Sequence, residues 1–171
     1  FDEMYHISAG YAFLQTGKVG WLPEHPPLVW QMAALPLIGL APQLPENVDN
    51  KGDFAHRFLY ENTADPDMLL FCARMPVVLL TLVLIWGIYS WARELWGCRA
   101  GWLAALLPAL DPNLIAHGQL VTNDVGLTAF FFLAVYAFWR LLQRPSPGRL
   151  VVTGVAVGLV RSGPLFCLFG I

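Results

Sequence analysis

The chain has 171 residues, of which 57% are hydrophobic and only 13% are charged, and its mean hydropathy is +0.55. A soluble domain carries about 25% charged residues, so this composition indicates a protein whose main solvent is lipid. A net charge of −2 and a pI of about 6.0 exclude the basic surface of a nucleic-acid-binding protein. The three cysteines (Cys72, Cys98 and Cys167) form no CxxC pair, which argues against a disulfide framework or zinc site and for small buried side chains.

The first predicted element is an amphipathic helix over residues 2–16, DEMYHISAGYAFLQT. Its apolar stripe follows the helical period and consists of Met4, Ile7, Tyr11 and Leu14. Gly17 suits the C-terminal end of such a helix. The segment is shorter than the roughly 20 apolar residues that a spanning helix needs. We therefore expect it to lie in the membrane interface.

Residues 26–65 comprise an apolar segment followed by a polar one. Residues 26–40 begin with two prolines, which suit a first helical turn, and then meet Pro36, so a short or kinked helix is expected. Residues 41–65 are rich in proline and acids and predict a polar loop. Asp65 followed by Pro66 has the pattern of a helix N-cap with proline in the first turn. Residues 1–68 are thus expected to form an outer loop with interfacial helices.

Four long apolar segments follow. They lie at about 69–92, 100–118, 124–142 and 150–171, and each is near the roughly 17–25 residues of a spanning helix. Asp111, inside the second segment, is interpreted as a helix end. Four such segments in succession predict an all-α, polytopic integral membrane protein.

The distribution of charge predicts the orientation. The loop after the first segment holds Arg93 and Arg99, and the loop after the third holds Arg140, Arg144 and Arg149. The connection at 111–124 holds no Lys or Arg, so the positive-inside rule places the arginine loops in the cytoplasm and this connection outside. All the acids except Glu94 then lie on the outer side.

Six ionisable residues on that outer side have the chemistry for group transfer: Asp2, Glu3, His6, Glu24, His25 and Asp124. A carboxylate at a lipid–water boundary is partly desolvated, binds a proton more tightly and can act as a general base. Histidine or arginine can neutralise a phosphate leaving group, and a bound divalent ion can do the same. These residue types suit the transfer of a group from a phosphorylated lipid. Their spacing in the sequence does not show that the three separate segments that carry them converge.

Three motifs carry a family resemblance. DEMYH with G…LQTG, then EHPPL, and later LDPNLIAHGQLVTND resemble the outer loops of the protein O-mannosyltransferase superfamily, whose bacterial relatives include the lipid A aminoarabinose transferase. The resemblance covers roughly residues 2–160. It implies a GT-C fold and sugar transfer from a polyprenyl-phosphate donor to a hydroxyl or phosphate of a protein, lipid or glycan, with inversion. By this resemblance the chain is an N-terminal fragment that lacks the first transmembrane helix and the C-terminal part.

The resemblance also assigns roles. Asp2 corresponds to the general base and Glu3 to its usual neighbour, so both are expected to be catalytic. Residues expected from the resemblance to bind the donor phosphate or substrate are Glu24, His25, Arg74 and Asp124, and His6 is added to them for its residue type and place on the outer side. No cofactor is expected to be required, a divalent metal stays open, and no metal ligand is assigned. The expected location is a bacterial inner membrane, with the site on the periplasmic face.

Simpler interpretations stay open. Asp2 and Asp124 suit helix caps, Glu24 and His25 suit a helix start, His6 suits the interface, and Arg74 suits a headgroup anchor.

The second functional class is a transporter or a non-catalytic membrane subunit. Transporters place ionisable residues inside their spans. In this sequence, Arg161 alone lies deep within a predicted span. The acids gather at one interface instead, which favours the enzyme.

Overall fold

Every regular element of the computed structural model is a helix within the residues it describes, which are 2–17, 28–46, 48 and 50–161. The elements are α1 (Glu3–Thr16), α2 (Leu28–Ala34), the 3-10 helix η1 (Leu35–Leu40), α3 (Lys51–Tyr60), α4 (Pro66–Trp96), α5 (Cys98–Ala109), α6 (Pro112–His117), α7 (Asn123–Gln143) and α8 (Pro147–Arg161). The all-α prediction is therefore confirmed for this part of the chain.

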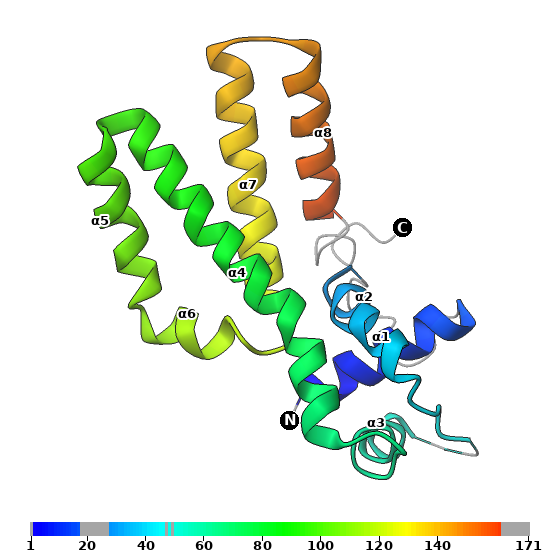
Figure 1. Ribbon diagram of the computed structural model, residues 1–171. Helices are drawn as coiled ribbons and strands as arrows, with labels where there is room; N and C mark the ends of the chain where they lie inside the picture. The colour runs from blue at the N-terminus through cyan, green and yellow to red at the C-terminus, as the bar shows by residue number, and fades with distance from the viewer. Residues whose placement is uncertain (1, 18–27, 47, 49, 162–171) are drawn as a thin grey trace.

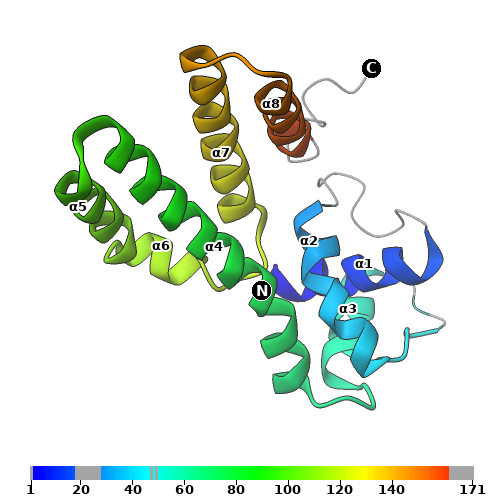
Figure 2. The same ribbon diagram turned by 45° about the horizontal axis from the view of Figure 1, so that its top comes forward.

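The helices are arranged in two groups (Figure 1). Helices α5, α4, α7 and α8 lie side by side, with α4–α5 and α7–α8 as antiparallel pairs. Helices α1, α2 and α3 gather around the N-terminal half of α4, as the turned view also shows (Figure 2). The two arginine-bearing connections, α4–α5 and α7–α8, lie at the end of the molecule opposite α1–α3. This is the arrangement that the charge-based orientation requires.

Two helices are long and apolar enough to cross a membrane. They are α4, with 31 residues, and α7, with 21. The predicted segment at 100–118 is instead divided into α5 and α6, because the Asp111 carboxylate accepts a hydrogen bond from the backbone N–H of Leu114 at 2.9 Å and starts a new helix. For the fourth segment, the described apolar helix covers Pro147–Val160.

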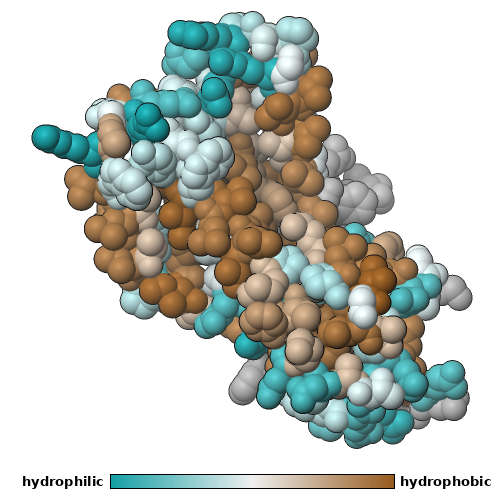
Figure 3. All heavy atoms as spheres, viewed as in Figure 1, coloured by the Kyte–Doolittle hydropathy of each residue, from teal (hydrophilic) through white to brown (hydrophobic). Residues whose placement is uncertain are grey.

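An apolar belt surrounds the layer of long helices. Figure 3 shows hydrophobic side chains between two ends that carry the hydrophilic ones. The exposed members on these helices include Leu79, Leu82, Trp86, Trp102, Leu103, Leu107, Phe131, Phe138, Val151 and Val155. Contiguous apolar surface of this extent is rare on soluble monomers. Together with the two long apolar helices, it supports a place in a membrane.

Local sequence signals explain several helix ends. Gly17 adopts the left-handed conformation with φ 69°, and its N–H bonds to the carbonyl oxygen of Phe13. The carboxylate of Asp65 accepts from the N–H groups of Asp67 and Met68, with Pro66 in the first turn of α4. The change from α2 to η1 at Leu35 agrees with the expected short or kinked helix. Cys98, by contrast, is exposed at the start of α5, so its prediction as a buried side chain is wrong.

The prediction of a polar loop over 41–65 is wrong for residues 51–60, which form α3. The Asn50 side chain caps this helix by accepting from the N–H of Asp53 at 2.8 Å. The helix then buries Phe54, Ala55, Phe58 and Leu59. Their spacing is helical, but the acids, prolines and asparagines around them dominated the composition of the segment.

Two glycines allow α2 to pack closely between α1 and α7. A Cβ at Gly10 of α1 would collide with the backbone carbonyl of Trp30, and one at Gly126 of α7 would collide with the side chain of Val29. Trp30 is 1% exposed, so the contact at Gly10 lies in the interior of the group formed by α1, α2 and α3. The carbonyl cannot rotate away without disturbing α2.

Gly10→Ala is therefore expected to destabilise the protein by about 1–3 kcal/mol, the usual cost of overpacking. The measurement is the melting temperature of the full-length protein in detergent, followed by intrinsic fluorescence. Gly154→Ala is the matched control, because Gly154 is also helical and a Cβ there meets nothing within 4 Å. A melting temperature for Gly10→Ala at or above that of the control would contradict the close contact.

Candidate functional site

The N-terminus of α1 is tied to α4 by an ion pair. The Glu3 carboxylate accepts two hydrogen bonds from the Arg74 guanidinium, from Nε at 2.9 Å and from Nη2 at 2.6 Å. The Glu3 side chain is only 13% exposed, and that of Arg74 is 35% exposed. A two-pronged pair of this kind fixes the orientation of both side chains. The pair therefore sets the position of the start of α1 against α4.

A third segment joins the same carboxylate. Glu3 Oε1 also accepts from the backbone N–H of Val121, at 3.1 Å, and Val121 is fully buried. Val121 belongs to the connection between α6 and α7. The hydroxyl of Thr81 in α4 provides a second tie to this region, 2.9 Å from the carbonyl oxygen of Gly118. Glu3 thus joins α1, α4 and the 118–122 connection, and so brings two of the predicted site residues, Glu3 and Arg74, into direct contact.

Asp2 lies directly beside this junction. Its side chain is exposed and makes no capping hydrogen bond, although its carbonyl oxygen accepts from the N–H groups of Tyr5 and His6. Among the described residues no ion pair includes its carboxylate. The interpretation of Asp2 as a side-chain cap therefore lacks the hydrogen bond it needs, and the carboxylate lies in solvent next to a fixed neighbour.

The remaining predicted site residues lie at different depths. His6 is one turn further along α1 and is 7% exposed. Asp124 is exposed in the first turn of α7, three residues after Val121, where its charge favours the helix N-terminus. No hydrogen bond or ion pair connects Asp124 to Asp2, Glu3 or Arg74 within the described part of the chain. Glu24 and His25 lie outside the described residues.

No three metal-ligating side chains (His, Cys, Asp or Glu) converge within the described residues. Glu24 and His25 are not among those residues. The site as described therefore consists of one exposed carboxylate, Asp2, beside a fixed carboxylate–guanidinium pair.

A comparison with known families identifies the group to which this architecture belongs. The model of the family described as dolichyl-phosphate-mannose-protein mannosyltransferase matches residues 68–161, which is more than half of the chain. The chain belongs to this family. No curated protein and no solved structure matches the chain. Membership confirms the resemblance found in the sequence and implies a glycosyltransferase of the mannosyltransferase type.

The matched region covers α4 to α8 and includes Arg74 and Asp124. Asp2 and Glu3 precede it. Their connection to the family region is the structural one, through the Glu3–Arg74 pair and the Val121 N–H. The roles of individual side chains stay predictions.

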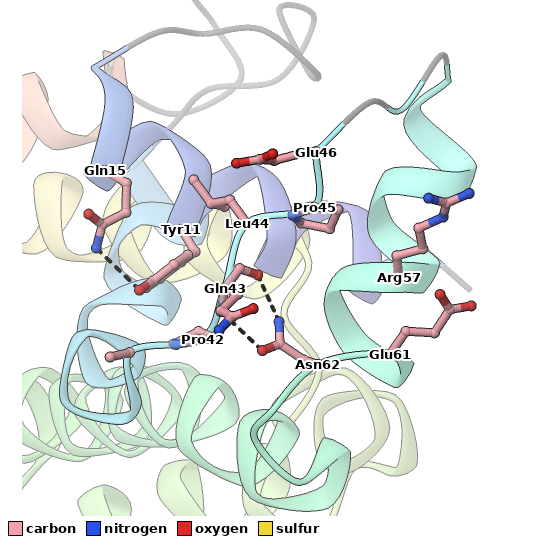
Figure 4. Close-up of a pocket in the computed structure, with 11 residues that line it drawn as sticks. Tyr11, Gln15, Pro42, Gln43, Leu44, Pro45, Glu46, Arg57, Glu61 and Asn62 are labelled. Atoms are coloured by element: carbon pink, nitrogen blue, oxygen red, sulfur yellow. Dashed lines mark hydrogen bonds between the residues drawn. The ribbon is translucent and has the colours of Figure 1, made fainter.

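Two structural features were not found from the sequence. One is the Val121 N–H, since a backbone donor carries no side-chain signature. The other is an open cavity of about 860 Å³ beside the C-terminal half of α1 (Figure 4). Its lining is Tyr11, Gln15, Ala41, Pro42, Gln43, Leu44, Pro45, Glu46, Arg57, Glu61 and Asn62. Asn62 closes one wall by exchanging two hydrogen bonds with the Gln43 backbone, at 2.8 and 3.0 Å.

Proposed function

We propose that this protein transfers a sugar from a polyprenyl-phosphate donor to a hydroxyl or phosphate acceptor on the outer face of the membrane, with inversion at the sugar carbon. Family membership supports the reaction class. The observation that carries the site is the Glu3 junction, because it gathers α1, α4 and the 118–122 connection beside Asp2. The acceptor is a protein, lipid or glycan.

Asp2 acts as the general base in this proposal. The acceptor oxygen attacks the sugar carbon from the side opposite the phosphate, a new C–O bond forms, and the bond to the phosphate oxygen breaks. The proton of the acceptor hydroxyl passes to the Asp2 carboxylate, and polyprenyl phosphate leaves with the bonding electrons. An exposed carboxylate without a capping bond is available for that proton.

Glu3 has a positioning role instead, whereas Arg74 both holds Glu3 and binds the donor phosphate. The Glu3 carboxylate already accepts three hydrogen bonds, so it is less suited to accept a substrate proton. Arg74 directs two of its five N–H donors at Glu3 and retains the others for an anion. Because Arg74 is partly exposed, these remaining donors are available to the donor phosphate, where they stabilise the developing charge.

The arginine loops support an orientation in which Asp2 faces outward. The α4–α5 connection, flanked by Arg93 and Arg99, and the α7–α8 connection, with its three arginines, lie at the end opposite α1 (Figure 1). By the positive-inside rule this end is cytoplasmic. The site then lies on the periplasmic face of a bacterial inner membrane.

The test is sugar transfer by the full-length protein in detergent with radiolabelled polyprenyl-phosphate sugars. The panel pairs undecaprenyl and dolichyl carriers with mannose, glucose and aminoarabinose, and sugar nucleotides serve as the control donors. We expect release of polyprenyl phosphate from at least one lipid-linked donor and none of the control sugars to be transferred. A folded protein that releases no polyprenyl phosphate from any donor would support the non-catalytic membrane subunit instead.

A further inference from the structure

A second cavity lies at the end of the molecule opposite Asp2. It has a volume of about 390 Å³ and opens where α7 ends and α8 begins, against the end of α4. Its lining residues are Glu94, Trp139, Arg140, Gln143, Arg144 and Arg149. The lining contains three arginines and one glutamate, so the cavity has an excess of positive charge that suits an anion.

Two of the three arginines are held in place. Arg149 Nη1 donates to the carbonyl oxygens of Arg140 and Arg144, at 2.8 and 3.1 Å, at the C-terminus of α7. The Arg140 guanidinium lies 5.7 Å from the centre of the Tyr136 ring, and its Nε is 3.8 Å from Glu94. The Tyr136 hydroxyl also donates to Glu94, at 2.8 Å, so the single carboxylate of the cavity is already engaged.

An apolar groove lies next to this cavity, between α7 and α8. It has a volume of about 400 Å³, and Arg140 lines both spaces. The groove is lined by Phe130, Leu133, Tyr136, Ala137, Arg140, Val151, Val152, Val155, Ala156 and Leu159. From Val151 to Leu159 a helix rises by about 12 Å, enough to accommodate part of an acyl chain. The positively charged cavity and the apolar groove therefore share one lining residue, Arg140.

We propose that this composite space binds an anionic phospholipid, with its phosphate on Arg140, Arg144 and Arg149 and one acyl chain along the α7–α8 groove. Three observations favour this occupant over a free anion or a peptide. The excess positive charge matches a phosphate, and the groove is almost wholly apolar. The cavity lies at the arginine-bearing ends of α7 and α8, and the groove extends from there along both helices, within the apolar belt. Basic pockets on the cytoplasmic side of membrane helices recognise anionic headgroups in this way. The site is separate from the proposed donor site.

The test measures lipid binding to the full-length protein by native mass spectrometry. Phosphatidylglycerol, phosphatidylcholine and inorganic phosphate are titrated in separate arms. We expect phosphatidylglycerol to bind more tightly than phosphatidylcholine. Arg144→Gln should weaken phosphatidylglycerol binding about fivefold, the effect of one basic residue near a membrane surface. Arg99→Gln is the matched control, since Arg99 is exposed at the same end but does not line the cavity.

A second pair of variants tests the groove. Val155→Trp fills it and is expected to weaken phosphatidylglycerol binding, whereas Val157→Trp, which is similarly exposed but outside the lining, leaves it unchanged. Equal binding of phosphatidylcholine would overturn the proposal, as would equal losses in Arg144→Gln and Arg99→Gln. Inorganic phosphate that displaces phosphatidylglycerol, with no effect of Val155→Trp, would show a site for free anions. If Val155→Trp fails to fold, the arginine pair still decides the headgroup.

Discussion

Replacing Asp2 by asparagine is expected to lower the rate of sugar transfer by about 10²–10⁴-fold, the usual contribution of a general base. Asparagine keeps the size of the side chain but cannot take the acceptor proton at neutral pH. Because the Asp2 side chain is exposed and makes no capping hydrogen bond, the melting temperature should hardly change. The measurement is polyprenyl phosphate release by the full-length variant, beside a melting curve.

Asp67→Asn is the matched control for this experiment. Asp67 is also an exposed acid near the start of a helix, α4, and it has no proposed role. Its substitution should leave transfer unchanged. Full activity in Asp2→Asn would contradict the role of Asp2 as the base. A comparable loss of activity in Asp67→Asn would show that the effect comes from the loss of any negative charge at this end of the molecule.

The sequence predicted those features that depend on neighbouring residues. Asp65 with Pro66 marks the start of α4 and Gly17 marks the end of α1, because caps are local hydrogen-bonding patterns. The long apolar helices α4 and α7 follow from composition. The arginine loops share one end of the molecule, as the alternation of charge along the chain predicted.

Features that depend on competing or distant contacts were missed. Phe54 and Phe58 bury one face of α3, but the polar residues around them hid the helical period. Asp111 was interpreted as a helix end, yet the sequence did not show that α6 begins there as a separate helix. Glu3 and Arg74 were each singled out, while their pairing across 71 positions could not be predicted, since no local period relates them.

Breaking the Glu3–Arg74 pair should affect both stability and turnover. Hydrogen bonds to charged groups contribute about 1.5–3 kcal/mol each, and Glu3→Gln leaves a partly buried guanidinium without its carboxylate. A displaced start of α1 would also move Asp2, and a shift of about 1 Å at a reacting group can cost about 10²-fold in rate. We expect Glu3→Gln and Arg74→Gln to lower the melting temperature and the rate of sugar transfer together.

A double-mutant cycle distinguishes positioning from direct catalysis. For stability, the double variant should be little worse than either single variant, since the second substitution removes a contact that is already lost. For turnover, it should be little worse than Arg74→Gln, because that substitution removes both the pair and the proposed contact with the donor phosphate. Asp53 and Arg57 provide the control cycle for stability: they are an exposed pair at 3.1 Å within α3, expected to contribute only about 0.3–0.5 kcal/mol. Arg74→Lys should not rescue the pair, because lysine cannot make the two-pronged contact.

One result would reverse the roles assigned to Asp2 and Glu3. If Glu3→Gln removed turnover with an unchanged melting temperature, while Asp2→Asn stayed active, Glu3 would be the base and its three hydrogen bonds would have to rearrange when substrate binds. The opposite pattern, in which Glu3→Gln lowers stability and rate together and Asp2→Asn lowers the rate alone, follows from the geometry. Glu3 is enclosed by α4 and by the Val121 N–H, whereas Asp2, one residue earlier, is exposed to solvent.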